Sequence, residues 1–142
     1  MDIEIRNYKQ EDYPDIKAIL EDVDFFDEFW DSEQNYFSMV KNSPHAIQVV
    51  LADKKVVGSI VLNSHGDEVT FFYRFAIKKE FRNKGIGSKL LEKVEKLAKE
   101  RGAKSVAFYV NDSKEDLKEY YKRRGYQTSG KKYVCMWKLL NK

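Results

Sequence analysis

Two glycines separated by one residue open a strongly helical stretch, in the sequence FRNKGIGSKLL. Inside a helix a glycine costs about 1 kcal/mol relative to alanine, so Gly85 and Gly87 point to a close approach of the backbone to another group. The first turn of a helix carries free N–H groups and roughly half a positive charge, and glycine lets a bulky anion reach them. With Arg82 and Lys84 beside it, this helix start suits a phosphate; a helix entry with incidental glycines is the alternative.

The two commonest phosphate motifs are absent from the sequence. No G-x-x-x-x-G-K-[ST] occurs, and G-x-G-x-x-G fails after its second glycine. No cluster of Cys and His has the spacing of metal ligands, so no metal is expected. The single cysteine, Cys135, lies in an apolar stretch and is expected to be a buried small side chain rather than a nucleophile.

Length and composition indicate one soluble domain spanning residues 1–142. Hydrophobic residues make up 42% and charged residues 35% of the chain, which is typical of a folded globular protein. No apolar run approaches the roughly 20 residues of a membrane span, and the N-terminus, MDIEIRNY, lacks a signal-peptide pattern. We therefore expect a cytoplasmic protein with no membrane partner.

The elements that must position the glycine pair form an α+β pattern with the order β-α-α-β-β-β-α-β-α-β. This order predicts a mixed, mostly antiparallel central sheet flanked by helices. A serine, Ser32, can cap the second helix, which ends at Asn42-Ser43-Pro44. Strands are expected at residues 3–6, 46–52, 56–63, 68–77, 104–110 and 133–139, and the other helices at 13–22, 84–101 and 112–124.

Three stretches of the sequence together resemble the GNAT superfamily of N-acetyltransferases. The family's acyl-CoA motif R/Q-x-x-G-x-G/A matches residues 82–87 within AIKKEFRNKGIGSKLLEKVEKLAKERG. The opening IEIRNYKQEDYPDIKAIL is similar to the family's first strand and helix, and residues 120–126 resemble its L-Y-x-x-x-G-F/Y segment. The resemblance implies the GNAT fold over nearly the whole chain, with acetyl-CoA as acyl donor.

The resemblance also implies where acetyl-CoA binds. In the family, the strand before the motif pairs with the pantetheine arm, and the motif loop holds the pyrophosphate on its N–H groups. The matching strand residues here are Phe75, Ala76 and Ile77. The matching loop residues are Arg82, Asn83, Lys84, Gly85, Ile86, Gly87 and Ser88.

A tyrosine of the later motif commonly protonates the departing thiolate in this family, and its match is Tyr121. A phenol with a pKa of about 10 is a weak acid suited to a thiolate whose pKa is about 8.5; the alternative for Tyr121 is an aromatic core residue. Where family members often carry Asn seven residues earlier, this chain has Lys114. Asn111, at the end of the preceding strand, is the substitute candidate for contacting the cofactor.

The sequence names no general base. Family members often carry Glu or His on the strand that faces the acetyl group, but the matching stretch here is FFYR, residues 71–74. Deprotonation of the amine could run through water to one of several groups. The candidates are Glu28, Glu33, Glu68, Tyr73 and the solvent.

Charge is segregated along the chain. Residues 1–40 hold 12 acids and 3 bases, a net charge of −9, whereas residues 41–142 hold 11 acids and 23 bases, a net charge of +12. The family resemblance places the acidic, aromatic stretch FFDEFWDSEQNYF beside the acceptor, where carboxylates and aromatic faces would suit a cationic amine. The alternative is a set of core aromatics with solvated acids. The expected acceptor-binding residues are Asp27, Glu28, Trp30, Asp31 and Tyr73.

The resulting prediction is an enzyme that transfers acetyl from acetyl-CoA to a primary amine, with a lean toward a small cationic amine, polyamine-like or lysine-like. A protein N-terminal or lysine acetyltransferase and a non-catalytic acyl-CoA-binding sensor stay open. Nucleic acid is not an expected partner, because the bases of the long helix alternate with Glu92, Glu95 and Glu100. A homodimer is left open.

Overall fold

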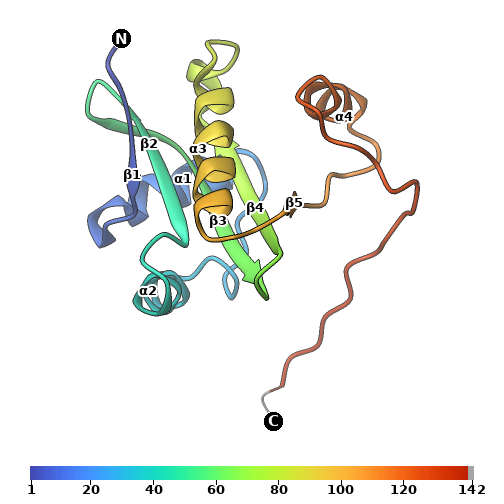
Figure 1. The fold of residues 1–142 in the computed structure, drawn as a ribbon. Helices are drawn as coiled ribbons and strands as arrows, with labels where there is room; N and C mark the ends of the chain where they lie inside the picture. Colours follow the sequence, from blue (N-terminus) through green and yellow to red (C-terminus); the bar gives the residue numbers. More distant parts are fainter. Residues whose placement is uncertain (141–142) are drawn as a thin grey trace. The chain divides into compact units, whose positions relative to one another are not determined.

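A five-stranded sheet forms the centre of the protein in the computed structural model, which describes residues 1–140. The strand order is β1-β2-β3-β4-β5, antiparallel except for the parallel pair β4 and β5 (Figure 1). This arrangement confirms the predicted α+β fold with a mixed, mostly antiparallel sheet. The strands are β1 (Ile3–Asn7), β2 (Ile47–Ala52), β3 (Lys55–His65), β4 (Val69–Ile77) and β5 (Ser105–Ala107).

The helices begin where the sequence provides start signals. Pro14 lies in the first turn of α1, and the Oγ of Ser32 accepts a hydrogen bond from the Asn35 N–H at 3.1 Å at the start of α2. The cap expected at Ser32 is therefore confirmed. The α-helices are α1 (Tyr13–Asp22), α2 (Glu33–Asn42), α3 (Ile86–Glu100) and α4 (Glu115–Lys122), and short 3₁₀ turns occupy Gln10–Asp12 and Lys79–Phe81.

Helices cover both faces of the sheet between β1 and β4. Figure 1 shows α3 lying across the front of the sheet with α1 behind it. Ile16 and Leu20 of α1 pack with Val49 of β2 on one side, while Leu90 and Val94 of α3 are fully buried on the other. Because both of its faces are covered, β2 is buried at every position.

The chain divides into two compact units. The first spans Met1–Phe108 and contains the sheet with α1, α2 and α3, and the second begins at Tyr109 and contains α4. The prediction of a single domain over residues 1–142 stays a prediction. None of the helices within residues 1–140 is long and apolar enough to cross a membrane.

The C-terminal part differs from the expectation. Residues 133–139 were predicted as a final strand, but no strand is assigned there in the structure, and the strand expected at 104–110 is limited to β5. A strand exists only where a neighbour completes its hydrogen-bond ladder, which β-branched and aromatic residues alone do not ensure. Cys135 lies in this segment and is exposed, so its expected burial is wrong.

Candidate active site

The segment that carries the two glycines is here called the glycine loop (residues 82–88). It follows β4 and the short 3₁₀ turn Lys79–Phe81, and it includes the first residues of α3. The Nε of Arg82 donates to the carbonyl oxygen of Ile77 at 2.9 Å, which folds the arginine back on the end of β4. Asn83 and Gly85 have φ values of 61° and 79°, in the left-handed region. Open space surrounds the position where a Cβ on Gly85 would lie, so the backbone there is accessible to a ligand.

The start of α3 has the properties of an anion site. Gly85 is the N-cap and provides no side-chain cap, and the first turn contains no acidic residue. The Lys89 N–H donates to the Gly85 carbonyl at 3.1 Å. The N–H groups of the first turn of α3 point out of the N-terminal end of the helix. Among the residues that the structure describes, neither Lys84 nor Lys89 forms an ion pair. Positive charge is therefore available beside these N–H groups.

The second half of β4 presents one edge without a neighbouring strand. β5 pairs with β4 only through Val69, Thr70 and Phe71. Further along, Ala76 and Ile77 pair with β3, and no described strand lies on their other side. This is the stretch for which pairing with pantetheine is expected, and its geometry is compatible with that role.

The acidic segment between α1 and α2 (residues 23–32) is held by its own carboxylates. Asp31 has a side-chain exposure of 1% and accepts from the Nε of Arg74 at 3.0 and 3.1 Å, from the Tyr36 hydroxyl at 3.1 Å and from the Asp27 N–H at 2.9 Å. This carboxylate is buried and already bonded, so it holds the fold of the segment. Its expected contact with the acceptor stays a prediction.

The other members of the expected acceptor set are more accessible. Asp27, Glu28 and Trp30 are exposed. The Oδ1 of Asp27 accepts from the N–H groups of Trp30 and Phe29 at 3.0 and 2.9 Å, and these bonds hold the pKa of Asp27 below its usual value. An exposed, ionised carboxylate therefore persists on the segment.

Tyr73 is part of β4, and its side chain contacts α2. Its hydroxyl is 3.9 Å from the sulfur of Met39, and its ring meets the edge of Trp30 with centroids 6.3 Å apart. Burial raises the pKa of Tyr73 above that of a free phenol. The phenol therefore stays protonated at neutral pH, which makes it an unsuitable base.

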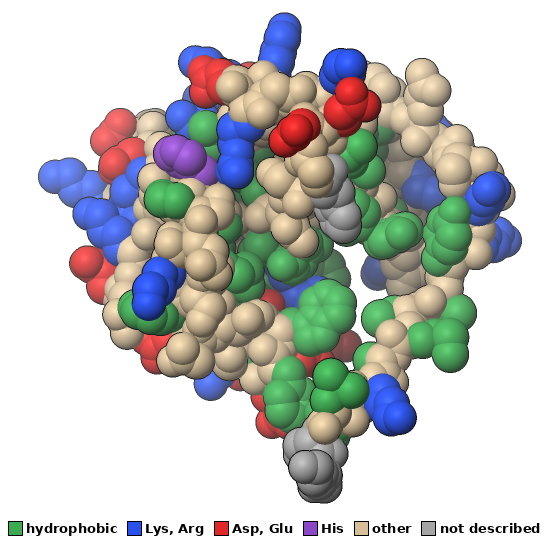
Figure 2. Space-filling model, turned by 60° about the horizontal axis from the view of Figure 1, so that its bottom comes forward, with side chains coloured by type: hydrophobic (Ala, Val, Ile, Leu, Met, Phe, Trp, Pro, Cys, Tyr) green, Lys and Arg blue, Asp and Glu red, His purple; other side chains and the backbone are tan. Residues whose placement is uncertain are grey.

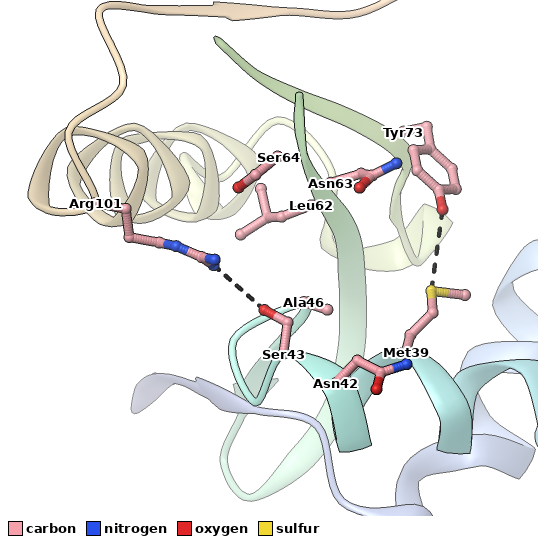
Figure 3. A pocket seen from close by; sticks show the side chains of 9 residues that line it. All are labelled: Met39, Asn42, Ser43, Ala46, Leu62, Asn63, Ser64, Tyr73 and Arg101. Atoms are coloured by element: carbon pink, nitrogen blue, oxygen red, sulfur yellow. Dashed lines mark hydrogen bonds between the residues drawn. The ribbon is translucent and has the colours of Figure 1, made fainter. Parts of the chain in front are cut away.

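A pocket of about 290 Å³ opens next to Tyr73. It lies where β3 continues past Val61, the residue that pairs with Ile47 at the start of β2. Figure 3 shows Tyr73 and Arg101 on opposite sides of it, with the Nη1 of Arg101 donating to the Ser43 Oγ at 3.3 Å. The volume is at the lower end for small-molecule sites. Of the expected site residues only Tyr73 lines it. Its lining consists of Met39, Asn42, Ser43, Ala46, Leu62, Asn63, Ser64, Tyr73 and Arg101.

In the second unit, Tyr121 lies on α4 and is 9% exposed. Its ring packs edge-on against Tyr120 and Tyr126, with centroid distances of 5.2 and 5.7 Å. The pKa of Tyr121 is raised well above its ordinary value. Burial is the main cause, and the neighbouring Tyr120 is the second. Such a phenol keeps its proton at neutral pH, as a general acid must.

Asn111 takes part in a local turn of the second unit. Its Oδ1 accepts from the N–H of Ser113 at 3.0 Å and from the Ser113 hydroxyl at 2.7 Å, while Lys114 is the N-cap of α4. The acceptor oxygen of Asn111 is thus used within the turn. Its expected contact with the cofactor stays a prediction.

Sequence reasoning did not identify Arg74 as a site residue, although a signal was present. Arg74 is the only charged residue in the strand VTFFYRFAI, and a charge in the middle of an apolar strand needs a partner. No group of three or more potential metal ligands was found within the described residues.

Comparison with known proteins gives one family and many similar folds. The family model described as "Acetyltransferase (GNAT) family" matches residues 3–126. The PaiA N-acetyltransferase from Thermoplasma acidophilum, solved in complex with coenzyme A, is 20% identical with a TM-score of 0.79, covering 93% of this chain and 94% of that one. Ard1 from Thermoplasma volcanium is 20% identical (TM-score 0.78, covering 92% and 86%). Glucosamine-6-phosphate N-acetyltransferase from Arabidopsis thaliana is 18% identical (TM-score 0.72, covering 99% and 100%).

Proposed function

Because this chain belongs to the GNAT acetyltransferase family, we propose that it transfers the acetyl group of acetyl-CoA to a primary amine and favours a small cationic amine. The family supports acetyl-CoA-dependent acetyl transfer, and a structural neighbour was solved with coenzyme A. The observation that carries the proposal is the glycine loop, whose left-handed Gly85 leaves open space beside the first turn of α3.

We assign the pyrophosphate of acetyl-CoA to the glycine loop. The N–H groups at the start of α3 would donate to its oxygens, as helix N-termini do for anions generally. With its Nε on the Ile77 carbonyl, Arg82 can turn its two terminal nitrogens toward the same phosphates. The edge of β4 at Phe75, Ala76 and Ile77 would accept and donate main-chain hydrogen bonds to the pantetheine arm.

The chemical step needs two proton transfers. The neutral amine nitrogen bonds to the thioester carbonyl carbon, the C–S bond breaks, and the thiolate takes a proton while the amine nitrogen loses one. Tyr121 is the proposed proton donor to the thiolate, supported by a pKa that keeps its phenol protonated.

The proton from the amine is proposed to leave through water. Residues 71–74 provide no carboxylate or imidazole, and Tyr73 is protonated. Two of the candidate acids are already engaged, because Glu33 accepts from Gln10 at 3.2 Å and Glu68 pairs with Lys104 at 3.0 Å. Glu28, exposed on the acidic segment, is the candidate that no described partner occupies.

The preference for a cationic acceptor rests on the exposed acids of the acidic segment, Asp27 and Glu28. They attract a cation at long range but are screened by salt. Trp30, which is 49% exposed, adds an aromatic face. A lysine side chain or a protein N-terminus would gain from the same features, so a protein substrate is the variant that the assay must compare.

A non-catalytic acyl-CoA sensor is the second candidate, favoured by the absence of a base on β4. Nucleic-acid binding has less support. On the face drawn in Figure 2, Lys and Arg side chains stand among Asp and Glu side chains instead of forming one continuous field. We further propose a reducing, cytoplasmic location, because the chain's one cysteine, Cys135, has no intramolecular disulfide partner.

The test is release of thiol from acetyl-CoA with a panel of amines, measured beside binding of coenzyme A alone. The panel contains spermidine, lysine, ethanolamine and a peptide with a free N-terminus. Amine-dependent thiol release supports the enzyme. Tight binding of coenzyme A without turnover of any amine would favour the sensor, and absence of binding would overturn both.

A further inference from the structure

Arg74 occupies an unusual backbone position in the middle of β4. Its φ is 54°, in the left-handed region that non-glycine residues rarely adopt. The register of β3 with β4 changes there, because Ser59 faces Ala76 whereas Val61 faces Tyr73. Two steps along β3 thus correspond to three along β4, which is a β-bulge with an extra residue on β4.

The bulge directs two consecutive side chains to the same side of the sheet. In a regular strand neighbouring side chains point to opposite faces. Here Tyr73 reaches Met39 of α2 and Arg74 reaches Asp31 at the start of α2. The strained backbone therefore aims the guanidinium of Arg74 at the acidic segment.

The guanidinium of Arg74 enters a cage of one carboxylate and two aromatic rings. Its Nε bonds to both oxygens of Asp31. Its central carbon lies 5.3 Å from the ring centroid of Trp30 and 5.9 Å from that of Phe25, within the range of cation–π contact. These are the groups that the sequence offered to a cationic acceptor, and the protein's own cation is bound there instead.

Stability alone gives little reason for this arrangement. A buried ion pair is often no more stabilising than apolar side chains of the same volume, and the left-handed backbone adds about 1–2 kcal/mol of strain for a non-glycine residue. Strain that persists at such a position points to function. The pair joins the acidic segment to the bulge, where β4 loses its pairing with β5.

We propose that Arg74 is a positioning residue that determines acceptor specificity. It fixes the acidic segment against the β4 bulge and fills the cage of Asp31, Phe25 and Trp30, so that a cationic acceptor meets the outer carboxylates and the exposed part of the Trp30 ring. This inference rests on the proposed function. Removal of the guanidinium should release the segment and open the cage to a second cation.

The variant Arg74→Gly tests the proposal without adding strain, because glycine adopts a φ of 54° readily. We expect the KM for ethanolamine to rise about tenfold, while kcat and the KM for acetyl-CoA change less than about twofold. The kcat/KM for spermidine divided by the kcat/KM for ethanolamine should rise about tenfold. The reason is that an ammonium group of the acceptor can then occupy the desolvated cation–π cage that Arg74 has left. Millimolar methylguanidine should reverse both changes, whereas sodium chloride at the same ionic strength should not.

Arg6→Ala is the matched control. Arg6 pairs with the buried Asp12 at 2.8 Å, and its side-chain exposure of 21% is close to the 19% of Arg74. Its loss should lower the free energy of unfolding without changing the ratio between the two amines. An equal change of that ratio in both variants would show that Arg74 acts only through stability, and would overturn the proposal.

Fluorescence separates failure of this inference from failure of the proposed function. In a Trp137→Phe background the emission of Trp30 reports the cage directly, with no need for turnover. Arg74→Gly should shift that emission, and methylguanidine should restore it; an unchanged emission would overturn the anchoring role. A restored emission with no turnover of any amine would support the anchor and overturn the specificity role together with the proposed function.

Discussion

The acidic segment and the glycine loop both carry concentrated charge, but they use it differently. In the acidic segment, Asp31 is buried against Arg74, and Asp27 caps the backbone of Phe29 and Trp30. In the glycine loop, open space lies beside Gly85, and Lys84 has no ion-pair partner among the described residues. One region uses part of its charge to hold its own fold, and the other presents charge and N–H groups outward. Counting charges does not distinguish the two uses.

The largest effect is expected outside both regions, at Tyr121. Tyr121→Phe should lower kcat by roughly 10- to 1,000-fold, as loss of a general acid does, with little change in the affinity for acetyl-CoA. Steady-state rates with saturating acetyl-CoA and isothermal titration with coenzyme A measure the two quantities. This variant sets the scale of a purely chemical defect, against which defects in the two regions are compared.

Tyr120→Phe is the control for that variant, because it removes a neighbouring hydroxyl from the same helix. The pH profile adds a second check. Since burial raises the pKa of Tyr121, the phenol stays protonated up to and beyond the ordinary value of about 10. The wild-type rate should therefore rise with pH as the amine loses its proton and show no fall before about pH 10. A wild-type rate in Tyr121→Phe would assign the proton to another donor.

The next largest effect is expected on stability, and it should differ between two carboxylates of the acidic segment. Asp31→Asn removes one charge of a buried pair and should lower the free energy of unfolding by about 3 kcal/mol. Asp27→Asn changes an exposed group and should have a much smaller effect. Urea denaturation of both variants measures the difference. Equal losses would mean that the buried pair with Arg74 is not what holds the segment.

A substitution in the glycine loop should weaken the binding of acetyl-CoA rather than the stability of the protein. Gly87→Val places a branched side chain at the second residue of α3, where it would keep an anion from the N–H groups. We expect the Kd for acetyl-CoA to rise by roughly 10- to 100-fold, the equivalent of one or two lost charge-assisted hydrogen bonds.

Glu92→Val is the matched control, since it introduces the same β-branched residue at an exposed position of α3. It should leave the Kd for acetyl-CoA within about twofold, because its branched side chain lies away from the N–H groups at the start of the helix. Unchanged affinity in a folded Gly87→Val protein would remove the glycine loop from the acetyl-CoA site.

The smallest effect should come from the exposed acids. The double variant Asp27→Lys and Glu28→Lys should raise the KM for spermidine about threefold at low salt, spare acetyl-CoA, and lose this effect at high salt as the charges are screened. Reversal of the charges of Glu21 and Asp22, which are also exposed but lie on α1, is the control. Equal KM values for spermidine in both double variants would show that the acidic segment is only a solvated surface.

Local patterns in the sequence determined much of the fold and the place of the glycine loop at the start of α3. The cap at Ser32 and the apolar face of α3 are set by neighbours within a few residues, and each strand from 47 to 77 pairs with the strand next to it in the chain. The sequence therefore predicted these elements correctly. The glycine loop was equally readable, because Gly85 and the helix start that it caps are adjacent in the chain.

Only the tertiary structure decided which charges are used internally. Asp31 and Arg74 are 43 residues apart, and their pairing depends on a bulge that no local pattern announces. The sequence alone therefore offered Asp31 to the acceptor. The last predicted strand, at 133–139, failed for a related reason, because strand formation depends on a partner distant in the chain. Local propensity determines what a segment can form, and burial against distant residues decides whether its charges and edges remain available for a ligand.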